Sequence, residues 1–174
     1  MITHLRAERF DSDFFSSFDH LAWRLELLDE YDEPSTRLRM AQLQRGERLA
    51  PNQWWLDGLQ MAQERGASVG RVHVVGQLTD YLRYELGVYQ THAAAGEDIR
   101  ILPADAATRL DLPDFDYWLL DDAAVFRMNY GQRGVLLGQE MITDPATVSR
   151  CVGARKAATG LAIPLAQYRR KVAA

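Results

Sequence analysis

Hydrophobic positions along this chain repeat with two different periods, and the change of period marks the element boundaries. Near the N-terminus Phe10, Phe14 and Phe18 recur every four residues, which predicts a helix over this segment. Apolar residues then alternate with small or charged ones over 22–27, which predicts a strand with one buried face. The chain therefore opens with one helix and one half-buried strand.

Two further helices are predicted after a polar break that ends at Pro34. The first runs from about residue 35 to 45 and ends at Gly46. The second covers about 53–65, with one apolar stripe, and Gly66 follows it in the position where helices end in a left-handed residue.

The centre of the chain reads as strand, helix, strand. Residues 69–75 are rich in valine, 78–93 carry an apolar stripe of helical period that closes at Gly96, and 97–102 form a second short strand. This order is typical of a βαβ unit, in which two parallel strands are joined by a right-handed crossover.

Three strands at 117–120, 124–130 and 135–142 follow closely and predict an antiparallel meander. Asp144 and Pro145 then have the residue types of a helix N-cap and first turn, and the last helix is broken near Gly160 and Pro164. The predicted fold class is α/β (α+β): a mixed sheet with a central βαβ unit, a C-terminal antiparallel meander and flanking helices.

The size and composition agree with one domain. The chain has 174 residues, 47% of them apolar, which supports one core but not two. We divide it into N-terminal helices and strand (1–66), a central sheet (67–144) and a basic helical segment (145–174). No apolar run approaches the roughly 20 residues of a membrane helix, and the N-terminal residues lack the apolar core of a signal peptide.

The single cysteine, Cys151, excludes an intrachain disulfide, and we expect a cytoplasmic protein. Because Cys151 falls in a predicted helix, we expect a buried, inert thiol. The four histidines show no metal-ligand spacing, and neither a nucleophile elbow nor a phosphate loop is present. We expect no metal and no cofactor.

The charge is distributed unevenly. The net charge is −4, but every acidic residue lies within 1–144, whereas 145–174 holds six basic residues and no acid. A basic tail can fold back on the acidic body or bind an acidic partner or nucleic acid. The acidic body argues against direct nucleic-acid binding as the main activity.

One polar cluster on the βαβ unit is the main candidate site. Its members lie on the central helix and at the start of the next strand: Arg83, Tyr84, Glu85, Glu97, Asp98 and Arg100. Residues near strand ends of a parallel unit line the ligand crevice, so the cluster is either a ligand or partner site or an ion-pair network that locks helix to sheet. Both alternatives predict at least one arginine–carboxylate pair between helix 78–93 and strand 97–102, because a buried arginine needs a partner.

Several runs of the sequence, at 71–75, 80–86, 95–100 and 116–121, resemble an actinobacterial family of unknown function. Members of that family are often encoded beside helix-turn-helix regulators. The resemblance implies a regulatory accessory role with a helix-turn-helix regulator protein as partner.

A more distant resemblance is to one half of a phospholipase D-like domain. On this alignment Asp121 takes the place of the catalytic aspartate, while Asp114 and Asp116 stand where the family has histidine and lysine. That chemistry requires a histidine nucleophile and a lysine that neutralises phosphate charge. The resemblance therefore implies a phospholipase D-like half that has lost its phosphodiesterase activity.

We therefore expect a non-enzymatic regulatory or sensor domain that acts through a protein partner. A small anionic ligand held by Arg83 and Arg100 is one component of this hypothesis, and a homodimer is compatible with it. One alternative is a hydrolase that uses acid–base groups, namely Glu85, Glu97, Asp98 and Asp121. The other is DNA binding by the basic C-terminal helix.

Overall fold

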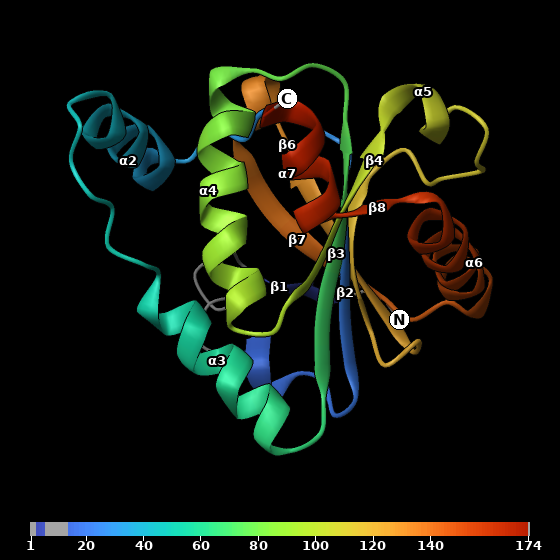
Figure 1. Ribbon diagram of the computed structural model, residues 1–174. Coiled ribbons are helices and arrows are strands. Elements are labelled where there is room, and N and C mark those ends of the chain that lie inside the picture. The colour runs from blue at the N-terminus through green and yellow to red at the C-terminus, as the bar shows by residue number, and fades with distance from the viewer. Residues whose placement is uncertain (1–2, 6–13, 174) are drawn as a thin grey trace.

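The computed structural model describes residues 3–5 and 14–173, and a mixed eight-stranded sheet organises this part of the chain (Figure 1). The strand order across the sheet is β1-β7-β6-β5-β2-β3-β4-β8. The strands are β1 (Thr3–Leu5), β2 (Leu21–Glu26), β3 (Ser68–Val75), β4 (Asp98–Pro103), β5 (Asp116–Leu120), β6 (Ala124–Tyr130), β7 (Leu136–Ile142) and β8 (Ile163–Pro164).

Helices cover both faces of this sheet. The helices α2, α3, α4 and α7 lie on one side, and α5 and α6 lie on the other (Figure 1). Their bounds, with those of two 3₁₀ turns, are η1 (Phe14–Ser16), α2 (Pro34–Gln44), α3 (Gln53–Glu64), α4 (Asp80–Ala94), α5 (Ala104–Ala107), η2 (Gln132–Gly134), α6 (Pro145–Leu161) and α7 (Leu165–Ala173).

The predicted fold class is confirmed. β3 and β4 are parallel and are joined by α4, which is the expected βαβ unit. β5, β6 and β7 pair as an antiparallel meander. The two parts meet at β2, which pairs in parallel with β3 on one side and antiparallel with β5 on the other. β2 is therefore central in the sheet.

The predicted helix ends are also confirmed. Gly46, Gly66 and Gly96 follow α2, α3 and α4 with φ of 75°, 79° and 101°, the left-handed region in which glycine carries no steric penalty. Asp144 caps α6, and its carboxylate accepts hydrogen bonds from the backbone N–H of Ala146 and Thr147.

The first predicted helix is not formed in the described residues. Phe10 lies outside them, and only the single 3₁₀ turn η1 remains. Phe14, Phe15 and Phe18 are all buried, in ring contact with one another. The guanidinium of Arg65 donates to the backbone carbonyls of Phe15 and Phe18, which a continuing helix would use for its own hydrogen bonds.

The prediction of a strand with one exposed face is also wrong for β2. The alternation is present, but both faces of this strand are covered. Trp23 and Leu25 face a core closed by α6, whereas Ala22 and Glu26 are buried on the side of α3 and α4. In the sequence, a buried charged residue such as Glu26 gives a central strand the same alternating pattern as a strand with one exposed face.

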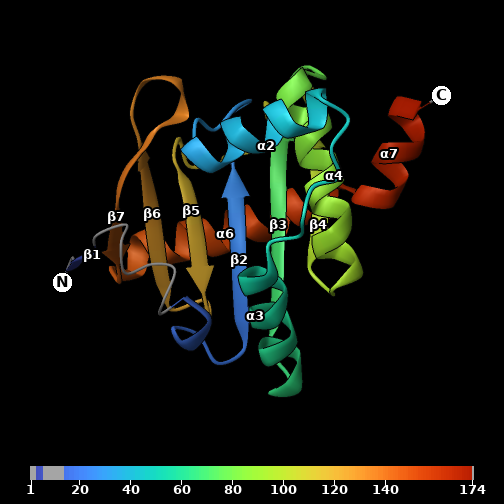
Figure 2. The same cartoon turned by 90° about the vertical axis from the view of Figure 1, so that its left-hand side faces the viewer.

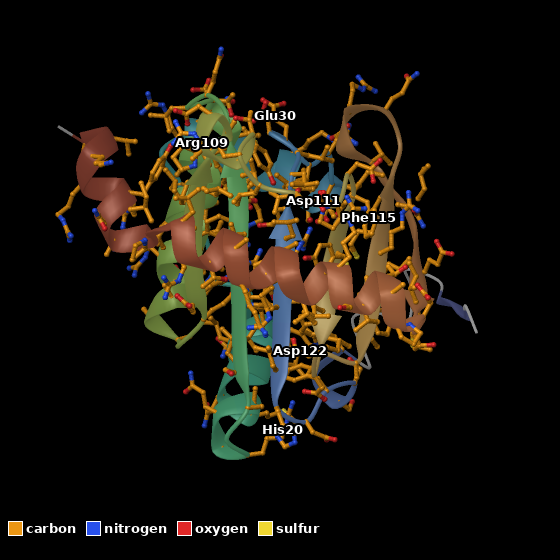
Figure 3. The ribbon with its side chains drawn as sticks, turned by 90° about the vertical axis from the view of Figure 1, so that its right-hand side faces the viewer. His20, Glu30, Arg109, Asp111, Phe115 and Asp122 are labelled. Atoms are coloured by element: carbon orange, nitrogen blue, oxygen red, sulfur yellow. The ribbon has the colours of Figure 1, made fainter. Side chains whose placement is uncertain are left out.

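The basic C-terminal segment folds back on the body. α6 crosses the strands on the face opposite α4 (Figure 3). Arg150 pairs with Asp111 at 3.1 Å, and Arg155 pairs with Asp122 at 2.7 Å. Cys151 lies on the buried side of α6 and is fully buried, as expected for an inert thiol. The break near Pro164 contains β8, which pairs with β4 and was not predicted.

The packing of η1 against α3 generates a pair of predictions of opposite sign. A Cβ at Gly58 in α3 would lie 2.0 Å from Cε2 of the buried Phe15 ring. We expect Gly58→Ala to lower the free energy of unfolding by about 1–3 kcal/mol because the packed ring has to move.

Gly87 in α4 is the matched control, because a Cβ there meets no atom within 4 Å. Gly87→Ala should raise the free energy of unfolding by about 0.5–1 kcal/mol through helix propensity alone. Urea unfolding of both variants measures the two effects. Equal effects of the two changes would contradict the packing of Phe15 on α3.

Candidate functional site

A cleft of about 780 Å³ opens on the face of the sheet that carries α2, α3 and α4. Figure 2 looks onto this face, with α2 above, α3 below, α4 at one side and strands β5 and β6 uncovered by helices. The floor comes from five strands, and α4 forms one wall. The linker between α2 and α3 and the loop after Glu30 complete the rim.

Strand register determines the charges on the floor. Arg24 of β2 lies beside Arg71 of β3, and Glu26 lies beside His73 in the same parallel pairing. Side chains two residues apart share a face, so all four point to the same side. Two adjacent guanidinium groups are unfavourable there unless carboxylates compensate them.

Two carboxylates supply that compensation. The Nε of Arg71 donates to Glu97 at 2.5 Å, and its Nη1 lies 3.3 Å from Oε1 of Glu26. The Nε of Arg24 is 3.2 Å from the same Glu26 oxygen. Burial opposes the ionisation of Glu26, but Arg24 and Arg71 outweigh it and hold the pKa of Glu26 well below its usual range. We name Arg24, Arg71, Glu26 and Glu97 the floor network.

Aromatic side chains enclose the floor network. The Tyr89 hydroxyl donates to Glu26 at 2.7 Å, and Nε1 of Trp55 donates to Glu97 at 2.9 Å. The guanidinium carbon of Arg71 lies 5.2 Å from the centre of the Tyr89 ring and 5.7 Å from that of Trp55. Such contacts stabilise a desolvated cation. The Arg71 guanidinium is therefore held by the carboxylates of Glu26 and Glu97 and by the ring faces of Tyr89 and Trp55.

Arg24 reaches towards the meander. Its Nη2 donates to the Tyr130 hydroxyl at 2.9 Å, and its guanidinium lies 5.6 Å from the ring centres of both Tyr31 and Trp118. The Tyr31 hydroxyl in turn donates to Asp116. The cleft floor therefore links the parallel and antiparallel parts of the sheet.

Glu85 of α4 is a third carboxyl group in the cleft. It is half-buried, accepts a hydrogen bond from Tyr81 at 3.0 Å, and forms no ion pair with any described residue. Burial, reinforced by the charge of Glu26, raises its pKa from 4.5 to about 7. Glu85 can therefore be either neutral or ionised near neutral pH.

Several buried polar atoms under the cleft lack hydrogen-bond partners among the described residues. They are Nε of Arg24, Nε1 of Trp118 and both amide atoms of Gln139, the last two residues being 1% and 3% exposed, and both ring nitrogens of His92. Nδ1 of His92 lies 3.4 Å from Glu97, outside hydrogen-bond geometry. An unsatisfied buried group costs about 1–3 kcal/mol, so their concentration at one cleft calls for an explanation.

The structure brings together only part of the predicted polar cluster. Glu85 and Tyr84 line the cleft, and Glu97 belongs to the floor network. Arg83 is exposed and forms no ion pair with a described residue. Tyr84 accepts a hydrogen bond from Arg39 of α2 at 3.0 Å.

Asp98 and Arg100 lie on the face of the sheet opposite the cleft, because successive side chains of a strand alternate between the two faces. In β4, Ile99 and Ile101 face α4, so Asp98 and Arg100, at the alternate positions, face the side of α6. Arg100 pairs with Asp98 of the same strand at 3.1 Å, partly exposed. The predicted arginine–carboxylate pair between α4 and β4 is therefore not formed in the described part of the chain.

The three aspartates aligned with the phospholipase D positions have distinct surroundings. Asp114 is exposed, and Asp116 is buried, where it also accepts from the backbone N–H of Leu27. Asp121 accepts backbone hydrogen bonds from residues 19, 20 and 21 at 2.7–2.8 Å. These bonds outweigh the effect of burial and lower the pKa of Asp121. The acids of the hydrolase alternative do not converge, because Asp98 and Asp121 lie away from Glu85.

The floor residues Arg24, Glu26, Arg71, Trp118 and Gln139 were not among the predicted site residues. A signal for three of them exists in the sequence, because charged side chains occupy alternate positions in two strands that are otherwise apolar. Those positions share one face in each strand, and neighbouring strands place them together.

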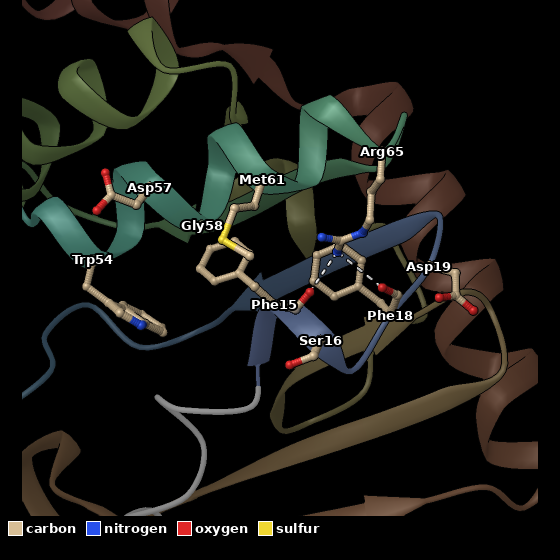
Figure 4. A pocket seen from close by; sticks show the side chains of 9 residues that line it. All are labelled: Phe15, Ser16, Phe18, Asp19, Trp54, Asp57, Gly58, Met61 and Arg65. Carbon is tan, nitrogen blue, oxygen red and sulfur yellow. Dashed lines mark hydrogen bonds between the residues drawn. The ribbon is translucent and has the colours of Figure 1, made fainter.

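A second, smaller groove of about 400 Å³ lies between α3 and the segment that contains η1 (Figure 4). Phe15, Phe18 and the exposed Trp54 and Met61 line it, with Arg65 at one end. Its cationic side chain, Arg65, already donates to the carbonyls of Phe15 and Phe18, so the larger cleft is the better candidate site.

Fold and site together define an α+β protein with an ionic, aromatic cleft on one face of a mixed sheet. The chain belongs to the family described as "Domain of unknown function (DUF6879)", whose model matches residues 8–170. A search of the curated proteins gives no match.

Two further observations bear on the site and its setting. The described residues contain no group of three or more histidine, cysteine, aspartate or glutamate side chains that could hold a metal ion. No helix within 3–5 and 14–173 has both the length and the hydrophobicity to cross a bilayer.

The floor network generates a prediction on stability. Arg71→Met leaves Glu26 with one arginine and Glu97 with none, and we expect it to lower the free energy of unfolding by about 3–5 kcal/mol. Arg100→Ala removes only a partly exposed pair and should cost about 1 kcal/mol or less. Urea unfolding at neutral pH compares the two. A larger loss for Arg100→Ala would contradict the assignment of the floor network.

Glu85 generates a prediction on pH. The folded protein binds the Glu85 proton more tightly than the unfolded chain does, because its pKa rises from 4.5 to about 7 on folding. The contribution of Glu85 to stability is therefore fully present at low pH and falls as pH rises through this window.

The matched variant is Glu85→Gln, which can still accept the Tyr81 hydrogen bond. We expect the wild type to lose about 2 kcal/mol relative to Glu85→Gln between about pH 4 and pH 8. Urea unfolding over this range measures the difference. A difference that stays constant with pH would show that Glu85 titrates as a solvated carboxyl group.

Proposed function

We propose that this protein is a non-enzymatic sensor domain that binds a small molecule in the cleft and acts through a protein partner. The observation that carries the proposal is the set of unpartnered polar atoms under the cleft, at Trp118, Gln139 and His92. A cleft of this volume, lined by aromatic side chains with a few polar groups, is typical of small-molecule sites.

Ligand binding at this position would be coupled to the protein's conformation. The unpartnered atoms are covered by neighbouring side chains, so a ligand that reaches them has to displace part of that cover. The rim includes the first turn of α2, in which only Thr36 is buried. A weakly packed helix beside a ligand site is the kind of element that can change position between two states.

The partner that we propose is a helix-turn-helix regulator, on the basis of the family resemblance. A scaffold of the phospholipase D type without catalytic activity fits the same proposal. β5 and β6 pair as neighbours, which that resemblance requires, while Asp114 and Asp116 do not supply a nucleophile or a cation.

Gln139 provides the test. In protein stripped of small molecules by refolding, Gln139→Met should raise the free energy of unfolding by about 1 kcal/mol, because it removes an unsatisfied amide. The same change should abolish capture of the small molecule that the wild type retains, measured by mass spectrometry after denaturation. The wild type and Gln139→Met also serve as bait in a pull-down of the proposed helix-turn-helix regulator.

Gln63→Met is the matched control, because the Gln63 amide already donates to the backbone carbonyl of Ala95 at 2.8 Å. It should leave ligand capture unchanged and should not stabilise the fold. If Gln139→Met destabilises the protein and the captured molecules do not change, the amide is satisfied by structural water and the proposal is wrong.

A further inference from the structure

Glu85 is a half-buried carboxyl group of the cleft that forms no ion pair with any described residue. Glu26 has Arg24 and Arg71 within 3.2–3.3 Å, and Glu97 has Arg71 at 2.5 Å. Glu85 has only the Tyr81 hydroxyl as a hydrogen-bond partner among the described residues. A half-buried carboxylate in this position is under-compensated, whereas both arginines below it lie within ion-pair distance of a carboxylate.

The other charges around the cleft cancel. Within the floor network two arginines balance two glutamates. At the rim, Arg37 pairs with Asp32 at 2.7 Å, while Arg39 and Glu33 contribute one charge of each sign without an ion pair between them. The ionised form of Glu85 therefore leaves the cleft with one net negative charge. The titratable and charged groups that face Glu85 are Tyr81, Tyr84 and Tyr89 from α4, Arg24 and Glu26 from β2, Arg71 from β3, and Arg39 from α2.

The walls suit a cation as well. Ring faces of tyrosine and tryptophan attract ammonium groups, and this attraction increases where water is excluded. The aromatic side chains that line the cleft are Tyr31, Tyr81, Tyr84, Tyr89, Tyr130, Trp54, Trp55 and Trp118. An anion would meet the opposite conditions on the floor: negative ring faces, an unpaired carboxylate and two arginines, Arg24 and Arg71, already engaged by glutamates.

We propose that the ligand of this cleft is a small organic amine, whose ammonium group donates to Glu85 while its carbon skeleton packs against the aromatic walls. This inference rests on the proposed function and specifies its ligand class. It replaces the anionic ligand expected at Arg83 and Arg100, neither of which lines the cleft.

Proton linkage follows from this arrangement. The ammonium group interacts favourably with ionised Glu85 only, and its own pKa is about 10 for an ordinary alkylamine, as for lysine. Because the pKa of Glu85 lies at about 7, affinity should rise with pH through that value, and binding near it should release a proton.

Three probes of similar shape separate the ligand classes: 2-phenylethylammonium, 2-phenylethanol and 3-phenylpropionate. Each is titrated into the full chain, with heteronuclear NMR of the Trp118 indole N–H as a reporter of cleft occupancy and calorimetry for affinity. We expect the ammonium probe to bind at least about tenfold more tightly than the other two, as a charge-assisted hydrogen bond would allow.

The variant Glu85→Gln should bind the ammonium probe about tenfold more weakly than the wild type does, and this affinity should no longer depend on pH. Its affinity for 2-phenylethanol should be unchanged. Glu64→Gln is the control, because Glu64 is exposed on α3 outside the cleft and bonds only Gln60. It should change none of the affinities.

The remaining outcomes contradict one or both proposals. If 3-phenylpropionate or 2-phenylethanol binds as tightly as the ammonium probe and shifts the Trp118 resonance, the amine is the wrong class while the sensor cleft stands. If the ammonium probe binds without shifting that resonance, the amine site lies outside the cleft and this inference is wrong. If no probe binds at millimolar concentration, both the inference and the proposed function lose their support.

Discussion

The burial of Arg71 in the middle of a sheet is the constraint on which much of this structure depends. A guanidinium group cannot lose its charge under ordinary conditions, so it has to find carboxylates wherever it is buried. Glu97 comes from the turn after α4 and Glu26 from β2, so the requirement of one side chain ties together three segments that are far apart in the sequence. The aromatic rings of Trp55 and Tyr89 then bring α3 and α4 onto the same group.

The floor network also accounts for the difference between the two faces of the sheet. On the face of α6 the strands present Leu25, Val72 and Leu119, and an apolar helix stripe closes over them. On the other face the ion pairs need polar and aromatic neighbours rather than a tight aliphatic layer. Helices α2, α3 and α4 surround this region without filling it, and the cleft lies between them. A buried ionic group therefore produces a candidate site without any sequence motif.

Buried ion pairs of this kind contribute little net stability compared with apolar side chains, but they define one arrangement. A shift of β2 by one residue against β3 would turn Arg24 and Glu26 to the face of α6 and leave Arg71 uncompensated. The alternation of charge in these strands thus specifies register. The same arrangement engages Arg24 and Arg71 with carboxylates of the floor network and leaves Glu85 without an ion pair, which gives the cleft its proposed preference for amines.

The order of elements was predictable from the sequence, because periodicity, caps and glycine positions act within a few residues of one another. The βαβ unit, the meander and the start of α6 at Asp144 were correct for this reason. The central place of β2 was not predictable, since pairing with β5 about 90 residues later leaves no local signal. For the same reason the candidate site was predicted only in part. Glu85 and Glu97 were correctly placed on the βαβ unit that carries the site. Asp98 and Arg100 lie on the opposite face of the sheet, because side chains alternate along β4. Arg24 and Arg71 became neighbours only through the register of two strands, and the compensation of buried charge across that register was decided by the tertiary structure.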